Sequence, residues 1–489
     1  RQAAREQKLP KTHAWRTSCA EYANSDSTTT LALWKVQERL IEERKLGKIY
    51  AERLRLLPVV CDMERVGVTL SAVRTQERIE QYSAESLSAE RKCKNIAEGY
   101  GVDLSLPKSG VNGSVTSFLL ETLKLPVLAK TPGGKPSLNA KVLETWEEQA
   151  KERSKPRAFL SALRGKRQRD TGVNYLTSYR RFWKHATREY YVLHPSLNVT
   201  GTHTLRMSSN NPNEQNISKK EGFNLRHVFG PAPGREWWSL DAKNIELRLP
   251  AYEAGETEMV ELFERPDDPP YYGSNHLLAC HVLHPEKFEE CMRDGVSFKD
   301  RYKTIYGWTK NGNFAVQYGA VEQSGTADRA YHVPGAQQRI QARFGKIKNL
   351  NEQTIEQANK QGYVETMPDR VVDSERGYPL NVEKSRWGGV LPTVPLNYHV
   401  QGTAMWWMAK AMVRCWEYLQ QHDGFHLIMQ IHDELVFDFP AGRGWRTNLP
   451  KVRRIKRLME EGGNDIGVPT PVSVTYHPET WSDGEEVKL

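Results

Sequence analysis

The sequence predicts an α+β protein in which several subdomains surround an antiparallel sheet. A chain of 489 residues is too long for a single hydrophobic core. The apolar run at 237–240 has strand character and ends in a carboxylate, Asp241, after which a helical pattern begins. Near the end of the chain, two apolar strands flank the pair His432-Asp433, as in a β-hairpin with a two-residue turn.

The first segment, residues 1–45, has a helical pattern, with Tyr22 and Asp26 four positions apart on one face. That pair could hold a metal-bound water, or it could simply lie on a surface helix. Residues 71–190 then predict an elongated helical arm. It is interrupted by a stretch rich in Gly, Pro and Ser and by a short helix candidate at 118–123.

The positive charge of the chain is concentrated in this arm. Lys and Arg total 69 against 60 Asp and Glu, a formal charge of +9. Residues 151–190 alone carry +9, with aromatic side chains between the cations, which favours a polyanionic partner over a solvated face. The twelve basic residues are Lys151, Arg153, Lys155, Arg157, Arg164, Lys166, Arg167, Arg169, Arg180, Arg181, Lys184 and Arg188.

The six cysteines are far apart and form no CxxC pair, so the sequence predicts neither a zinc site nor a disulfide framework. It contains no signal peptide and no apolar run of membrane-spanning length. We therefore expect a cytoplasmic protein without a membrane partner. Because the chain begins with Arg, we expect it to be a fragment.

A polar, amide-rich loop at 200–217 follows the arm and contains Arg206, Gln215 and Asn216. Such a segment is poor core material. Its side chains are suited to hydrogen bonds with base edges or with a sugar-phosphate backbone, although an ordinary surface loop is the alternative.

Residues 271–385 are mostly helical in pattern, and one helix there carries Lys310, Phe314 and Tyr318 at i, i+4 and i+8. Gly319 is placed to end it. A cation and two aromatic rings about 6 Å apart along one stripe could contact the phosphate, sugar and base of one nucleotide. A half-buried amphipathic helix is the alternative.

Two carboxylates remain to be explained. Asp241 could cap the helix that follows it, but a carboxylate at the end of a buried strand is costly unless a metal or hydrogen bonds compensate it. A helix that begins near Gln401 precedes the hairpin. The turn His432-Asp433 lacks the backbone freedom of Asn-Gly, which indicates a functional site.

Five of these segments, in this order, resemble motifs of family A DNA polymerases, the bacterial DNA polymerase I type. The similarity extends over roughly residues 58–489 and includes Glu479-Thr480-Trp481 near the end. The five are the amide-rich loop, the segment Leu240-Asp241 to Arg248, the stripe from Lys310 to Gly319, Gln401-Gly402-Thr403-Ala404, and His432-Asp433-Glu434.

This resemblance implies a right-hand fold with an antiparallel palm sheet, a helical thumb and helical fingers. The implied subdomains are a 3′–5′ exonuclease-like remnant at 1–57, palm at 58–70, thumb at 71–197, palm at 198–265, fingers at 266–395 and palm at 396–489. The remnant lacks the Asp-x-Glu strand of that exonuclease, so we expect no proofreading by this fragment. No 5′-nuclease domain is visible.

The resemblance also implies the chemistry. Asp241 and Asp433, with the carbonyl of Ala242, are expected to bind two Mg²⁺ ions, for which Mn²⁺ substitutes, and Glu434 is expected beside them. A primer 3′-hydroxyl would then attack a deoxynucleoside triphosphate. The expected partners are primer-template DNA and dNTP, bound by a monomer, with any accessory factor unspecified.

The roles of individual side chains follow from the same resemblance. Lys310, with His276 nearby, would face the triphosphate, Phe314 the sugar and Tyr318 the templating position, while Glu246 would exclude a 2′-hydroxyl. The residues expected to contact DNA are Arg206, Gln215, Asn216, Gln401 and His432, with Arg180, Arg181 and Lys184 of the thumb.

The sequence departs from the family pattern at two positions. Tyr306 stands where the family has an arginine, and Lys303 is our candidate to supply that charge. Pro250 lies inside the helix after Asp241, so that helix must start late or kink. Two other functions stay open: a single-subunit RNA polymerase, which Glu246 opposes, and a catalytically silent duplex-binding scaffold, which the departure at Tyr306 leaves open.

Overall fold

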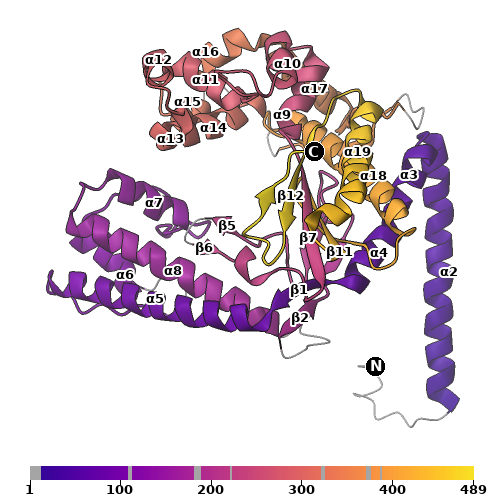
Figure 1. The fold of residues 1–489 in the computed structure, drawn as a ribbon, viewed down its shortest axis with the longest axis horizontal. Coiled ribbons are helices and arrows are strands. Elements are labelled where there is room, and N and C mark those ends of the chain that lie inside the picture. The colour runs from indigo at the N-terminus through magenta and orange to yellow at the C-terminus, as the bar shows by residue number, and fades with distance from the viewer. Residues whose placement is uncertain are drawn as a thin grey trace.

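The protein was analysed as a computed structural model that describes residues 13–107, 113–180, 189–220, 223–320, 325–370, 376–385 and 388–489. Its central feature is a five-stranded antiparallel sheet in the order β10-β11-β7-β12-β13 (Figure 1). The predicted α+β class is confirmed. The strands are β7 (Arg235–Ala242), β10 (His426–Ile431), β11 (Glu434–Pro440), β12 (Val472–His477) and β13 (Glu485–Glu486).

Strand β7 lies in the middle of this sheet, where its apolar side chains are buried on both faces. Trp237 and Trp238 are both fully buried, but they belong to different hydrophobic clusters because successive side chains of a strand point to opposite faces. Register places Asp241 of β7 opposite Glu434 of β11 and Ser473 of β12. The predicted strand and the predicted hairpin are therefore neighbours in one sheet.

Two long helices, α18 (Pro395–Leu419) and α19 (Leu449–Ile466), pack together and contribute to the larger core cluster. The expected start of the first helix near Gln401 is wrong, because α18 begins six residues earlier. Pro395 occupies its first turn, where the missing N–H of proline costs no intrahelical hydrogen bond. Gln401 consequently lies in the second turn of α18.

The arm predicted at 71–190 is a pair of long helices, α5 (Ala72–Glu98) and α8 (Lys155–Tyr179), with shorter elements at one end (Figure 1). Strands β1 (Val68–Ser71) and β2 (Tyr190–Leu193) pair at its base. The short helix expected at 118–123 is a π-helical turn, η1. The shorter elements are α6 (Gly113–Ser117), η1 (Phe118–Thr122) and α7 (Ala140–Gln149).

Much of the arm's positive charge is paired inside the arm. Arg164 forms ion pairs with Glu144 and Glu147 of α7. Lys166 pairs with Asp170 of its own helix and with Glu90 of α5. Arg169 pairs with Glu85 of α5. The excess of cations in the sequence therefore overstates the charge that the surface of the arm presents.

A third group of helices lies above the arm in Figure 1, at the end of the sheet opposite to the base of the arm. Within the described part of the chain, none of the helices combines the length and apolar character needed to cross a bilayer. The group comprises α9 (Ile245–Ala254), α10 (Thr257–Glu264), α11 (Asn275–Leu283), α12 (Pro285–Arg293), α13 (Phe298–Arg301), α14 (Lys303–Gln317), α15 (Thr326–Tyr331), α16 (Ala336–Arg343) and α17 (Gly345–Gln361).

Short elements connect these parts. They are β3 (Ser196–Asn198), β4 (Ser208–Asn210), β5 (Lys219–Lys220), β6 (Phe223–Asn224), β8 (Tyr363–Glu365), β9 (Pro379–Asn381) and the 3₁₀ turns η3 (Arg226–Val228) and η5 (Trp445–Asn448). The subdomain boundaries expected from the resemblance stay predictions.

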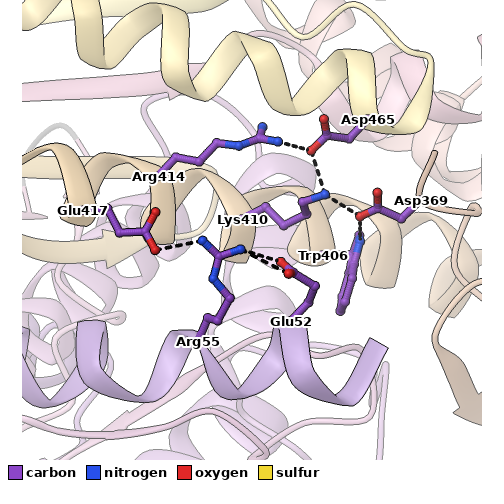
Figure 2. Close-up of polar contacts among 8 residues, drawn as sticks. All are labelled: Glu52, Arg55, Asp369, Trp406, Lys410, Arg414, Glu417 and Asp465. Atoms are coloured by element: carbon purple, nitrogen blue, oxygen red, sulfur yellow. Dashed lines mark hydrogen bonds and ion pairs between the residues drawn. The ribbon is translucent and has the colours of Figure 1, made fainter. Parts of the chain in front are cut away.

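The N-terminal helices are α2 (His13–Glu43), α3 (Gly47–Leu54) and α4 (Leu56–Val66). Helix α2 stands apart from the body in Figure 1, and residues 19–40, including Tyr22 and Asp26, are exposed. The α3–α4 junction, by contrast, is tied to α18 by an ion pair of 2.8 Å between Arg55 and Glu417 (Figure 2). Helix α4 packs on α18 and β10.

Candidate active site

The two predicted carboxylates meet at one end of the sheet. Asp241 is the penultimate residue of β7, and Asp433 is in the two-residue turn between β10 and β11. The N–H of Ala242 donates to the carbonyl of Asp433 at 3.1 Å, which fixes the two segments together. His432 takes up the strained turn geometry, with φ 54°, and its side chain is exposed beside the carboxylates.

This arrangement disfavours the ionised form of both carboxylates. Burial raises the pKa of Asp241 to about 6, and the neighbouring Glu434 raises it further. Burial likewise raises the pKa of Asp433 to about 7, with contributions from Glu246 and Asp241. Neighbouring carboxylates that repel one another are stabilised as anions by a bound cation.

The ligand atoms available are all oxygens. Within the described residues, no group of three or more His, Cys, Asp or Glu side chains is arranged to hold a metal ion. Two carboxylates and a carbonyl suit Mg²⁺, because this ion is often held by one or two carboxylates while water and substrate phosphates complete its shell. The site therefore fits a cation that is shared with a phosphate-bearing substrate.

Glu434 has a supporting position. One of its carboxylate oxygens accepts from Arg226 at 3.0 Å and the other from the indole N–H of Trp481 at 3.2 Å. The Arg226 guanidinium also stacks over the Trp481 ring at 3.6 Å. Both oxygens of Glu434 thus accept hydrogen bonds from protein donors. The C-terminal motif Glu479-Thr480-Trp481 therefore contributes to the site through Trp481. Arg226 is a second contact of Glu434, and the sequence analysis did not predict it.

Glu246, in the first turn of α9, is held by two other predicted residues. Arg206 of the amide-rich loop forms an ion pair with one carboxylate oxygen, and the Tyr318 hydroxyl donates to the other at 2.7 Å. Burial and the adjacent Glu246 raise the pKa of Tyr318, so its hydroxyl stays protonated. The structure therefore joins three predicted residues that are distant in sequence.

Pro250 is accommodated without breaking α9, because the helix starts late, at Ile245. Proline at this position leaves the carbonyl of Glu246 without its usual intrahelical donor. The Gln317 side chain, at the end of α14, donates to that carbonyl instead. A residue absent from our predictions thus links α14 directly to the backbone of Glu246.

The predicted stripe on α14 is confirmed as a helical surface. Phe314 and Tyr318 stack with ring centroids 6.3 Å apart, and the His276 ring lies 5.5 Å from Phe314. Lys310 is exposed two turns before Tyr318. Gly319 takes φ 76° after the helix, as a C-terminal glycine does.

His276 is a neutral, oriented imidazole. Burial, assisted by the charge of Lys310, lowers its pKa to about 4. Its Nδ1 accepts a hydrogen bond of 3.0 Å from the amide of Asn313, and Tyr331 fixes Asn313 at 2.7 Å. The tautomer inferred from this bond carries its proton on Nε2.

Tyr306, the departure from the family pattern, packs edge-on against His276 with centroids 6.2 Å apart. Lys303 is exposed at the first position of α14. A different cation, Lys299, has its ammonium 5.8 Å from the centre of the Tyr306 ring. Lys299 is therefore a second candidate for the positive charge that we assigned to Lys303.

The remaining predicted DNA contacts lie in several places. Gln215 is half-buried and Asn216 exposed at the end of the amide-rich loop, and Gln401 is half-buried on α18. Arg180 is exposed at the end of α8. Arg181 and Lys184 lie outside the described residues, so their predicted role has no structural counterpart here.

Comparison with known proteins places this site in context. The sequence profile of DNA polymerase family A matches residues 74–483. The chain is 28% identical over 471 residues to the thermostable DNA polymerase I of Thermus thermophilus, covering 92% of this chain and 50% of that protein. It is 26% identical to DNA polymerase I of Pseudomonas aeruginosa, covering 85% and 43%. The chain spans about half the length of these relatives.

A solved structure agrees with the fold. The chain is similar to the POL domain of Pol1 from M. smegmatis, in complex with DNA primer-template and dNTP, with a TM-score of 0.69. The match covers 87% of this chain and 69% of that one at 19% sequence identity. The predicted palm, thumb and fingers architecture is confirmed by this match.

Proposed function

The chain belongs to DNA polymerase family A, and we propose that it carries out template-directed DNA synthesis, adding deoxynucleotides to a primer 3′-hydroxyl. The observation that carries this proposal is the pairing of Asp241 and Asp433 across the Ala242–Asp433 hydrogen bond. Two neighbouring carboxylates with raised pKa values, next to a helix lined with a cation and aromatic rings, suit a phosphate-bearing substrate and a divalent cation.

In this proposal Asp241, Asp433 and the carbonyl of Ala242 hold Mg²⁺, or Mn²⁺ in its place. The chemistry that a pair of such ions supplies when bound is activation of the 3′-hydroxyl and stabilisation of the leaving pyrophosphate. Glu434 orients this end of the sheet through Arg226 and Trp481.

The residues on and near α14 bind the incoming nucleotide in this proposal. Lys310 attracts the triphosphate, and the Nε2–H of neutral His276 donates to a phosphate oxygen. Phe314 packs on the sugar. Glu246, held by Arg206 and Tyr318, occupies the space that a 2′-hydroxyl would need.

Primer extension with Mg²⁺ tests the proposal. We expect Asp241→Ala and Asp433→Ala each to abolish extension while duplex binding is retained. Glu485→Ala, an exposed carboxylate on the same sheet, is the matched control and should extend normally. Extension by either aspartate variant at the wild-type rate would refute the metal assignment, and a wild-type protein that binds duplex but never extends would indicate the silent scaffold.

The same assay with ribonucleotides separates the remaining alternative. A DNA polymerase gated by Glu246 should discriminate strongly against rNTP, and Glu246→Ala should raise rNTP incorporation. Equal use of rNTP and dNTP by the wild-type protein would instead indicate an RNA polymerase. An unchanged dNTP/rNTP ratio in the variant would remove Glu246 from the proposed gate.

A further inference from the structure

Helix α3 precedes the region that matches the family profile, yet its C-terminal end lies next to the palm helix α18. At the α3–α4 junction, Arg55 pairs with Glu417 of α18 (Figure 2). In the same view, Lys410 of α18 bridges Asp369 at 2.6 Å and Asp465 at 2.8 Å, which ties α18 in turn to its neighbours. The end of α3 therefore lies beside a helix that is itself anchored by buried ion pairs.

Arg53, near the C-terminal end of α3, reaches the amide-rich loop. Its Nη2 donates to the carbonyl of Val199 at 2.7 Å and to the carbonyl of Leu205 at 3.1 Å. These carbonyls are six residues apart, so one guanidinium closes the loop between them. Burial lowers the pKa of Arg53, because the charged guanidinium is largely removed from solvent.

The loop that Arg53 closes ends in a strained residue. Leu205 has φ 61°, a left-handed conformation that a leucine rarely adopts. Its side chain is buried in the palm core, at 7% exposure, whereas the next side chain, Arg206, pairs with Glu246. The left-handed conformation of Leu205 thus directs its own side chain into the core and the side chain of Arg206 toward Glu246.

Other contacts also stabilise this loop. The Thr202 hydroxyl donates to the carbonyl of Arg206 at 2.8 Å, and the His203 ring stacks on Tyr398 of α18 with centroids 6.0 Å apart. Neither of these contacts binds the carbonyl of Leu205 itself. Arg53 is the residue that does, and a strained conformation persists only when its surroundings hold it.

We infer that Arg53 is a positioning residue for nucleotide selection: by binding the Val199 and Leu205 carbonyls, it sets the direction of Arg206 and hence of the Glu246 carboxylate. The inference rests on the proposed function, in which Glu246 excludes ribonucleotides. It assigns a role in substrate selection to a segment outside the matched residues 74–483.

The test compares Arg53→Ala with Arg55→Ala, its neighbour two positions along, whose ion pairs lie at the surface. We expect Arg53→Ala to lower the dNTP/rNTP ratio of kcat/KM about tenfold, since small displacements of a positioning contact have effects of this size or larger. Arg55→Ala should leave the ratio unchanged. Arg53→Lys should recover part of the loss, because an ammonium can still donate to a carbonyl.

The ratio distinguishes positioning from simple destabilisation, because a smaller folded fraction lowers both rates equally. A ratio unchanged by Arg53→Ala would overturn the inference. The cycle with Arg206→Ala adds a second criterion: the double variant should be no less selective than Arg206→Ala alone, and additive losses would also overturn it. If Arg206→Ala itself leaves the ratio unchanged, the proposed gate fails; if only Arg53→Ala does so, the inference alone fails.

Discussion

Glu214 shows how much one buried side chain can affect the stability of this protein. It precedes Gln215 in the amide-rich loop, is only 3% exposed, and its Oε1 has no hydrogen-bond partner in the described part of the chain. Burial raises its pKa from an ordinary 4.5 to about 8. The folded protein therefore holds this carboxyl in its neutral form at physiological pH.

This shift predicts a pH dependence of stability. Between pH 4.5 and about 8 the unfolded chain is ionised at Glu214 while the folded chain stays protonated, so the unfolded state binds fewer protons and the free energy of unfolding falls as pH rises. We expect Glu214→Gln to remove this loss and to be more stable than wild type at pH 8 by about 4 kcal/mol. Urea unfolding at pH 5 and pH 8 measures it.

Glu98→Gln is the matched control, since it removes the same charge from an exposed position on α5. It should keep the wild-type pH dependence. A Glu214→Gln variant whose stability falls with pH as steeply as wild type would contradict the assignment of a neutral buried carboxyl.

At the residue scale, the sequence predicted those site residues whose signal is local. Asp241 ends an apolar strand and Asp433 occupies an unusual turn, and both patterns can be read within a few positions. Arg226 and Gln317 carry no such pattern, because their roles depend on partners 208 and 71 residues away. Only the packed fold brings Arg226 to Glu434 or Gln317 to Glu246.

At the element scale, the junction between α9 and α14 has a clear physical origin. Pro250 has no backbone N–H, so the carbonyl of Glu246 lacks its usual intrahelical donor. That carbonyl instead accepts a hydrogen bond from the Gln317 side chain of α14. An unpaired buried carbonyl would cost about 1–3 kcal/mol. The proline and the glutamine therefore act as a matched pair that joins the two helices.

We predict that Gln317→Leu disturbs this junction and raises the KM for dNTP several-fold, since Glu246 and the α14 stripe lose a shared anchor. Pro250→Ala restores a backbone N–H to α9 and should reduce the effect of Gln317→Leu when the two are combined. Steady-state incorporation by the two single variants and the double variant measures the coupling. Strictly additive effects would show that the two residues are independent.

The elements themselves were predictable where periodicity is local. The α14 stripe and the β10–β11 hairpin follow from spacing and alternation alone. The start of α18 was missed because the six residues before Gln401 have no clear apolar face, although Pro395 marks a first turn. Salt bridges between α5 and α8 were invisible for a different reason: Arg169 and Glu85 are 84 residues apart.

At the scale of the whole molecule, residue patterns alone predicted an α+β class and no more. The arrangement of palm, thumb and fingers came from the resemblance to family A, because strand order in a sheet is set by contacts between distant segments. Strand β7 pairs with β11 and β12, which both lie about 200 residues later in the chain. The contact of Arg53 with the amide-rich loop belongs to the same class of long-range information.

The arm's charge gives a prediction for the whole complex with DNA. The sequence suggests many phosphate contacts from residues 151–190, but Lys166 is 3% exposed and pairs with Asp170 at 2.6 Å. Arg180 is exposed, and its guanidinium donates a hydrogen bond to the neutral side chain of Gln76. Buried and exposed cations along α8 should therefore contribute differently to duplex binding.

We expect Arg180→Gln to reduce the slope of log Kobs against log salt by about 0.9, the loss of one phosphate contact, in anisotropy titrations of primer-template between about 50 and 200 mM salt. Lys166→Met should leave that slope unchanged and instead lower the Tm, because it leaves the Asp170 carboxylate without its 2.6 Å partner. A Lys166 variant with a shallower slope would show that this buried cation reaches DNA. An Arg180 variant with the wild-type slope would show that the grip on the backbone lies elsewhere on the arm.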